Sequence, residues 1–219
     1  MTDYIMLDDT NLEILAKKAA GAQAIAGYVN GTWANWDQVV AEYEKSGKHL
    51  VSIDVIGDAD AQCLDVERGD ATPAQAPAWV QRTMEAGIKA RDLRWFPKIY
   101  VEEGSARALL DAIEAAHIGR SDIRIWTGHW TGIPHICTMA SGCSVDADAT
   151  QWSNRYASLS LDINLCKPSF FDGPPAADKP PVAVKPPEIK LQTGIVVDST
   201  LITRRVTSKD LGKTWEAEA

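Results

Sequence analysis

Two carboxylic acids lie two residues apart in the segment 62–69, where they alternate with apolar residues. Leu64 and Val66 predict a buried β-strand, and a strand repeats every two residues, so Asp65 and Glu67 project from one face. Side chains two apart on a strand are roughly 6–7 Å apart, close to the separation at which an Asp/Glu pair flanks a glycosidic bond. Like charges this close also raise one pKa, as a general acid requires. The pair equally suits a solvent-facing strand end, so the rest of the chain must decide.

The elements that must position these acids follow from apolar, β-rich segments that alternate with helical patterns through residues 1–167. The expected strands are Tyr4–Asp8, Ala24–Val29, His49–Ile56, Gln62–Glu67, Trp95–Val101, Ile123–Thr127, Ala149–Ser153 and Ser160–Leu165. The expected helices are Asn11–Gly21, Asn35–Ser46, Pro73–Ala86 and Ser105–His117.

Strand–helix alternation predicts the α/β class, with a parallel sheet and helices outside it. Eight strands predict an irregular (β/α)8 TIM-like barrel, irregular because the connections after the third, sixth and seventh strands look too short or uneven for full helices. A doubly wound open sheet is the alternative. No G-x-G-x-x-G motif follows the first strand, which removes the usual reason to expect a dinucleotide.

The composition changes near residue 168. Residues 168–187 are rich in proline and predict a linker or extended arm. Residues 188–219 predict a short β-hairpin tail, too small for its own core and expected to dock on the barrel or on a neighbouring chain. The predicted organisation is therefore a barrel over 1–167, an arm over 168–187 and a docking tail over 188–219.

The chain has a net charge of −8, and basic and acidic residues balance from Pro168 onward, so the deficit lies in the barrel. An acidic body argues against nucleic acid, whose binding needs Lys and Arg to neutralise phosphate. No apolar run is long enough for a membrane span, and the N-terminus lacks the pattern of a secretory signal. We therefore expect no membrane partner, and a location outside a cell would require lysis or incorporation into a particle.

The cysteines and histidines show no metal-binding pattern. The four cysteines are Cys63, Cys137, Cys143 and Cys166, and no C-x-x-C pair occurs. Cys137 and Cys143 bracket a small loop and could form a disulfide, although reduced buried thiols fit equally well. His129 and His135 are too irregularly spaced to predict a metal site, and no metal ligand is assigned.

The carboxyl ends of the strands carry the candidate site residues, because a parallel barrel gathers functional side chains at that end. Aromatic faces stack on sugar rings, and carboxylates hydrogen-bond sugar hydroxyls and supply acid and base, so this set suits a saccharide. Asp54 and Asp162 would equally suit strand-end caps. The acids are Asp8, Asp9, Asp54, Asp65, Glu67 and Asp162, and the aromatic residues are Tyr100, Trp126, Trp130 and Trp152.

The order of these segments resembles the glycoside hydrolase family 25 lysozymes and the related DUF1906-type glycoside-hydrolase-like barrels of actinobacteria and their phages, over about residues 4–166. The resemblance is carried by Leu7-Asp8-Asp9, Leu64-Asp65-Val66-Glu67, Ile125-Trp126-Thr127-Gly128-His129-Trp130, Thr150-Gln151-Trp152 and Leu161-Asp162-Ile163-Asn164.

The resemblance also implies roles for individual residues. Glu67 would donate a proton to the leaving oxygen, and Asp65 would stabilise the positively charged transition state or position the acetamido group of the substrate. Asp8 or Asp9 would supply the first-strand acid and Asp162 a supporting contact. No metal or organic cofactor is implied.

Two functions remain open from the sequence. The first is a lysozyme-like hydrolase acting on the β-1,4 glycan of bacterial cell-wall peptidoglycan. The second is a non-catalytic structural, decoration or tail protein of a phage virion, whose barrel is displayed or binds the host surface. In that case residues 168–219 would attach the chain to phage structural proteins or to another copy of itself. Both place the protein in a phage particle or in the medium after lysis.

Overall fold

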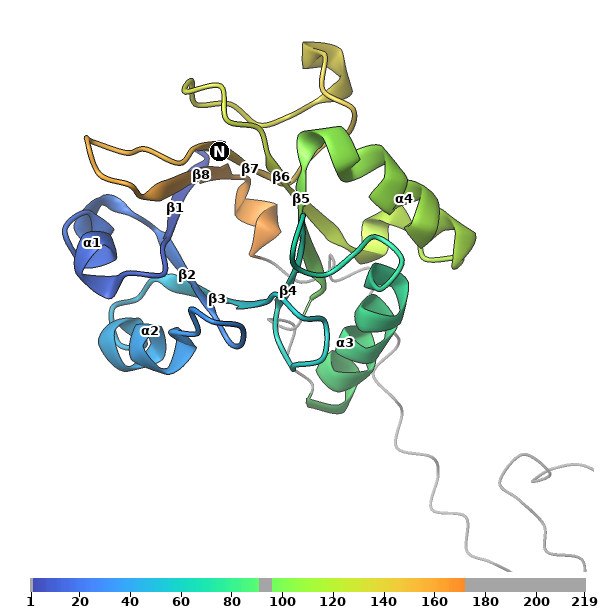
Figure 1. Cartoon of the computed structure of the whole chain (residues 1–219), viewed down its shortest axis with the longest axis horizontal. Helices are drawn as coiled ribbons and strands as arrows, with labels where there is room; N and C mark the ends of the chain where they lie inside the picture. The colour runs from blue at the N-terminus through green and yellow to red at the C-terminus, as the bar shows by residue number, and fades with distance from the viewer. Residues whose placement is uncertain (1, 91–95, 172–219) are drawn as a thin grey trace, which may run out of the picture. The chain divides into compact units, whose positions relative to one another are not determined.

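The computed structural model describes residues 2–90 and 96–171 of this chain, without the side chains of residues 88–90. All of the described residues belong to the first of two compact units, residues 1–179. The predicted tail (188–219) and the predicted arm beyond residue 171 lie outside the described residues. Eight strands close into a barrel in chain order, which confirms the barrel and excludes the open sheet (Figure 1). They are β1 (Tyr4–Asp8), β2 (Ala24–Tyr28), β3 (His49–Asp54), β4 (Cys63–Val66), β5 (Lys98–Glu102), β6 (Arg124–Gly128), β7 (Ala149–Ser153) and β8 (Asp162–Cys166).

The first seven strands are parallel, but β8 runs antiparallel to both β7 and β1. The expectation of a fully parallel sheet is therefore wrong for the last strand. The connection before it, residues 154–161, forms a tight hairpin: Tyr156 and Leu159 exchange two backbone hydrogen bonds around Ala157 and Ser158, which both have positive φ, so the chain turns back along β7. The reversal places Asp162, at the start of β8, in register with Asp8, at the end of β1.

Within residues 2–90 and 96–171, four α-helices lie outside the barrel (Figure 1). They are α1 (Leu12–Ala16), α2 (Trp36–Tyr43), α3 (Ala76–Ala90) and α4 (Ala106–Ala115). The connections after β3, β6 and β7 contain no α-helix, as expected, and between β6 and β7 the only helical turn is the 3-10 segment Met139–Ser141. The fold is thus a closed eight-strand barrel with few helices rather than a helix-rich (β/α)8 barrel.

Local sequence explains where the helices form. The Asn11 side chain accepts hydrogen bonds from the backbone N–H groups of Glu13 and Ile14, which caps α1. In α4 the buried residues Leu109 and Ile113 are four apart and face the barrel wall. Each helix therefore covers one stretch of the barrel with an apolar stripe.

Alternate residues of the strands fill the barrel interior, as a period of two requires. Met6, Ala26 and Cys63 belong to this inner cluster, and Phe170 in the 3-10 turn after β8 packs into it edge-on to Trp126. Because β8 ends where β1 begins, Phe170 closes the end of the barrel at which the parallel strands start. The other end, which we call the mouth, is where β1–β7 finish and β8 starts.

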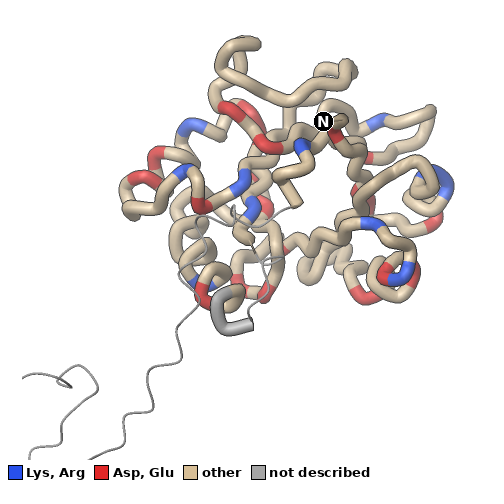
Figure 2. Tube along the Cα trace, turned by 180° about the vertical axis from the view of Figure 1, so that it is seen from behind, with Lys and Arg blue, Asp and Glu red and all other residues tan. Residues whose placement is uncertain are grey.

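Charges of both signs are distributed around the barrel (Figure 2). Among the residues that the structure describes, no helix has the length and apolar character needed to cross a membrane.

Candidate active site at the barrel mouth

The mouth holds a cavity of about 290 Å³. Every strand contributes a side chain at or near its mouth end, as expected for a barrel of this kind. The lining residues are Asp8, Tyr28, Ile53, Asp65, Glu67, Tyr100, Trp126, Trp130, Gln151, Asn154, Ser160 and Asp162, of which Ile53 comes from β3 one residue before its end.

Asp8 ends β1 and is buried. Its carboxylate accepts a hydrogen bond from the Asn164 side-chain amide at 2.6 Å and another from the Tyr28 hydroxyl at 3.3 Å. Burial raises the pKa of Asp8 to about 6, and these two hydrogen bonds limit the rise. The pKa of Asp8 is lower than those of Glu67 and Asp162, so it ionises at mildly acidic pH.

Asp65 lies in β4, in register with Tyr100 of β5, and only 6 % of it is exposed. Its Oδ1 atom is buried without a hydrogen-bond partner. Burial raises the pKa of Asp65 well above its usual value, and the nearby Glu67 carboxylate raises it further. An unpaired buried oxygen in a cavity wall is costly unless a ligand supplies the missing partner.

Glu67 follows the last residue of β4 and is partly buried. Burial raises its pKa to about 7, and the carboxylates of Asp70 and Glu102 add to the shift. Carboxylate oxygens of Asp65, Glu67 and Asp70 all lie within 4.8 Å of one another. The predicted proximity of Asp65 and Glu67 is thus present in the structure.

Asp162, the first residue of β8, is a further acid in the lining of the mouth. Burial raises its pKa to about 8, and the charges of Asp8 and Asp9 raise it further. Because burial and mutual repulsion act on all the acids of the mouth, they cannot all be ionised together near neutral pH. The cavity therefore holds protonated and ionised carboxyl groups side by side.

Aromatic residues also line the cavity. Tyr100 donates from its hydroxyl to Gln151 Oε1 at 2.6 Å, and the Trp126 indole donates to Asn164 Oδ1 at 2.8 Å. The rings of Tyr100 and Trp126 meet edge to face, with centroids 5.0 Å apart. Trp130 at the rim is 50 % exposed, so a large aromatic surface is available to a ligand.

Three of the predicted site residues lie outside the cavity lining. The Asp54 carboxylate is fully buried and accepts from the Trp79 indole and from backbone N–H groups of residues 56, 57 and 59. Asp9 accepts from the backbone N–H of Asn11, and Trp152 packs with the cluster that contains Leu15. Asp54 therefore acts as the strand-end cap that was its alternative interpretation.

The structure adds Tyr28 to the site and gives roles to Gln151 and Asn164, which the resemblance includes without assigning them a function. Tyr28 is the last residue of β2, so the rule that selected the other strand ends also applied to it. Gln151 faces inward and its neighbour Trp152 faces outward, as alternation along a strand requires. Asn164 lies two residues after Asp162 and links Asp8 to Trp126.

Two groups of possible metal ligands occur among the described residues. One is the acidic group just described. The other is formed by His129, His135, Cys137 and Cys143, whose spacing in the sequence predicts no metal site: potential ligand atoms of all four nevertheless lie within 4.8 Å of one another. The two cysteines are free thiols, and burial raises the pKa of Cys137 to about 12, which makes it a poor nucleophile.

No known protein family matches the sequence, and no curated protein is significantly similar to it. Two solved structures share the fold. An uncharacterised protein from B. stearothermophilus has a TM-score of 0.57 at 13 % identity, covering 77 % of this chain and 98 % of that one. A family GH25 lysozyme from Aspergillus fumigatus has a TM-score of 0.50 at 16 % identity, covering 76 % of this chain and 94 % of that one. The chain thus has a lysozyme-like barrel fold.

Proposed function

We propose that this protein is a lysozyme-like glycoside hydrolase, and that the active site at its barrel mouth cleaves the glycan of bacterial cell-wall peptidoglycan. The observation that carries the proposal is the pair Asp65 and Glu67 in one cavity, with carboxylate oxygens within 4.8 Å, beside the exposed ring of Trp130. Carboxyl pairs and aromatic platforms are what glycosidic cleavage requires. The barrel shared with a family GH25 lysozyme supports the same class.

Glu67 is the proton donor in this mechanism. With a pKa of about 7 it keeps its proton in mildly acidic and neutral solution, whereas an ordinary glutamate would have lost it. It follows the end of β4, so its carboxyl group reaches the cavity while its backbone is held by the barrel. It gives the proton to the leaving oxygen as the glycosidic bond breaks.

Asp8 and Asp65 act on the sugar ring. Asp8 ionises at a lower pH than Glu67, so it supplies negative charge to the oxocarbenium-like transition state. The unpaired Oδ1 of Asp65 accepts a hydrogen bond from the substrate, for which an acetamido N–H is suited. The bound sugar thereby satisfies an oxygen that has no partner in the free protein.

The short distance between Asp65 and Glu67 bears on the stereochemistry. Inverting glycosidases separate their two carboxyl groups by roughly 6.5–9.5 Å to admit a water molecule, and retaining enzymes by roughly 5–5.5 Å. A separation within 4.8 Å leaves no room for that water between Asp65 and Glu67, which favours retention with Asp65 orienting the acetamido group. We expect proton NMR of the first product to show the configuration of the substrate, and an inverted product would reassign the partner of Glu67.

The decisive experiment compares Glu67→Gln with Glu114→Gln on purified cell walls. Glu114 is exposed on α4, so this control makes the same chemical change away from the cavity. We expect Glu67→Gln to slow the release of reducing ends by about 10²–10⁴-fold, and Glu114→Gln to match the wild type. Equal rates for Glu67→Gln and wild type would remove Glu67 from the mechanism.

A glycan-binding protein without turnover is the second candidate. It is favoured by the raised pKa of Asp65 and Asp162, because protonated carboxyl groups bind sugar hydroxyls without supplying charge. Wild-type protein that sediments with cell walls but releases no reducing ends would establish it. In either case, attachment to a phage particle through residues 168–219 remains a prediction, and deleting them should abolish particle association.

A further inference from the structure

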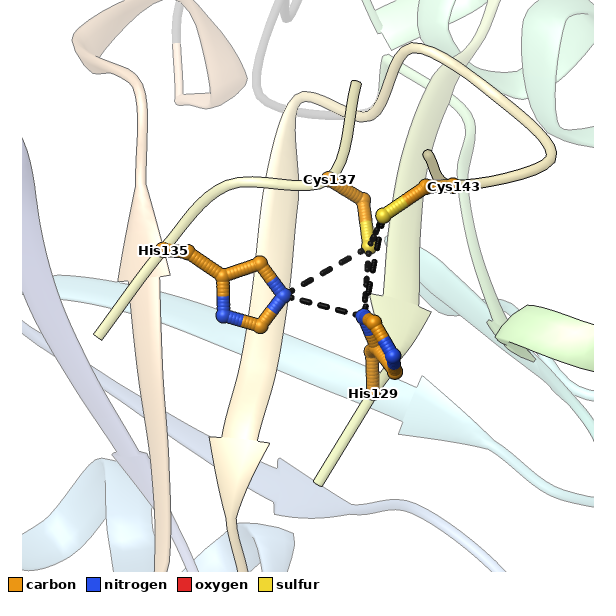
Figure 3. Close-up of side chains that lie close together, drawn as sticks. All are labelled: His129, His135, Cys137 and Cys143. Carbon is orange, nitrogen blue, oxygen red and sulfur yellow. Dashed lines mark hydrogen bonds between the residues drawn. The ribbon is translucent and has the colours of Figure 1, made fainter. Parts of the chain in front are cut away.

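The connection between β6 and β7, residues 129–148, occupies the place of a barrel helix but contains only one 3-10 turn. Four side chains of this loop converge: His129, His135, Cys137 and Cys143 (Figure 3). His129 comes directly after β6, and the other three come from the returning part of the loop. Two imidazoles and two thiols are a ligand set that Zn²⁺ commonly takes.

The distances between the four ligand atoms are short. His129 Nδ1 lies 3.0 Å from His135 Nε2, 3.3 Å from Cys137 Sγ and 3.6 Å from Cys143 Sγ. Cys137 Sγ lies 3.8 Å from His135 Nε2 and 2.7 Å from Cys143 Sγ. Every pair, including His135 with Cys143, is within 4.8 Å.

These distances compare well with the edges of a zinc tetrahedron. Zn–N bonds of about 2.0–2.1 Å and Zn–S bonds of about 2.3 Å place neighbouring ligand atoms roughly 3.3–3.8 Å apart. The distance between the two histidine nitrogens and the three nitrogen–sulfur distances given above are within a few tenths of an ångström of this range, whereas His135 and Cys143 are constrained only to lie within 4.8 Å. The two sulfur atoms must separate by about 1 Å to hold a zinc ion between them.

The surroundings orient two of the ligands. His135 Nδ1 lies 2.8 Å from the carbonyl oxygen of Ile133, so its N–H donates there and leaves the lone pair of Nε2 facing the cluster. Metal-bound histidines are typically held by this kind of hydrogen bond. The backbone N–H of Cys137 donates to Thr150 Oγ1 on β7 at 2.9 Å, which ties the loop to the barrel wall.

We propose that His129, His135, Cys137 and Cys143 form a structural Zn²⁺ site that fixes the β6–β7 loop to the barrel. Four protein ligands leave no position for water or substrate, which is the pattern of structural rather than catalytic zinc. The ion fixes the backbone beside Trp130, which follows His129 and lines the mouth cavity. The site stands independently of the hydrolase proposal, since it uses none of the acids.

The first test is the metal content of the full chain. Protein purified under reducing conditions and without chelator should contain about one zinc ion per chain, as measured by elemental mass spectrometry. Replacement of zinc by Co²⁺ should give the strong visible absorption of a tetrahedral site and a thiolate-to-cobalt charge-transfer band. A chain that takes up neither ion under reducing conditions, or that isolates with a Cys137–Cys143 disulfide and no metal, would overturn the proposal.

Variants then assign the ligands. Cys137→Ser and Cys143→Ser should each lose the bound zinc, whereas Cys166→Ala, which removes a buried thiol elsewhere in the barrel, should keep it. His135→Cys replaces one zinc ligand by another, so it should keep the ion and intensify the charge-transfer band. This variant and the wild-type cobalt spectrum remain informative if a serine variant fails to fold. Zinc retained in both serine variants would contradict the site.

Discussion

The acidic mouth and the His/Cys cluster both begin where a barrel strand ends, but they differ in the kind of ligand that would stabilise them. The mouth gathers carboxyl groups of one charge sign, each raising the pKa of its neighbours, in a cavity open to a ligand. The His/Cys cluster gathers nitrogen and sulfur atoms that point at one another. The first arrangement is unfavourable until a proton or a sugar compensates it, and the second becomes favourable when a cation enters.

This difference separates activity from stability. The acids are held by strands, so their positions persist whatever their protonation state. The His/Cys cluster lies in a loop that has little regular structure of its own and would be ordered by its ligand. Changes in the mouth should therefore act on rate, and changes in the loop on unfolding, which can be measured separately.

After Glu67→Gln, the largest effect is expected from Asp8→Asn. The amide keeps the shape of the side chain but removes the negative charge facing the sugar, so the rate of glycan cleavage should fall about 10²–10³-fold. The control is Asp111→Asn on α4, which removes only an exposed ion pair with Arg107. If both variants cleaved cell walls equally well, Asp8 would have no electrostatic role.

Chelation of the metal should have the next largest effect. Removing zinc from the loop should lower the unfolding temperature by several degrees, since a loss of about 2 kcal/mol corresponds to roughly 4–8 °C in a chain of this size. Hydrogen exchange should rise in residues 129–148 and remain unchanged in β1–β3. Exchange that rose evenly along the barrel would place the effect elsewhere than the loop.

The pH profile of cleavage sharpens the assignment in the mouth. Asp8 must be ionised, so activity falls as pH drops through about 6, and Glu67 must be protonated, so activity falls as pH rises through about 7. The rate should therefore peak between about pH 6 and 7 and fall about tenfold per pH unit beyond either limb. A profile that stays flat up to pH 9 would rule out Glu67 as the acid.

The smallest effect is a gain of stability in Asp162→Asn. The folded pKa of Asp162, about 8, is above its unfolded value, so this group destabilises the fold increasingly as pH rises from about 4 to 8. The amide removes that penalty and should raise the unfolding temperature by a few degrees at pH 8, with no gain at pH 4. Thermal scans at the two pH values test this. An equal gain at both would indicate packing rather than charge.

Most of the barrel could be predicted because its strands have strong local patterns. Asp8, Asp65 and Glu67 were identifiable because strand ends meet at one end of a parallel barrel. The same rule also predicts Asp54. Only the fold reveals that the following turn folds back and donates backbone hydrogen bonds to its carboxylate. The antiparallel direction of β8 could not be predicted from the length of residues 154–161, since the equally short connection 55–62 joins the parallel strands β3 and β4.

The His/Cys cluster could not be predicted in the same way. Its ligands come from an irregular loop, and their separations along the chain match no common zinc motif. No local rule determines how such a loop returns on itself. Strand β7 is a different case. The aromatic ring of Trp152 predicts a site residue, but the alternation of side chains along the strand places Gln151 in the cavity and Trp152 outside it.

The reversed last strand has a practical consequence. Because β8 starts at the mouth, the chain reaches Phe171 at the other end of the barrel, where its ring stacks on His49 at the beginning of β3. A bead or reporter joined after residue 171 is therefore linked opposite the opening. Protein immobilised in this way should remain able to engage an insoluble polymer.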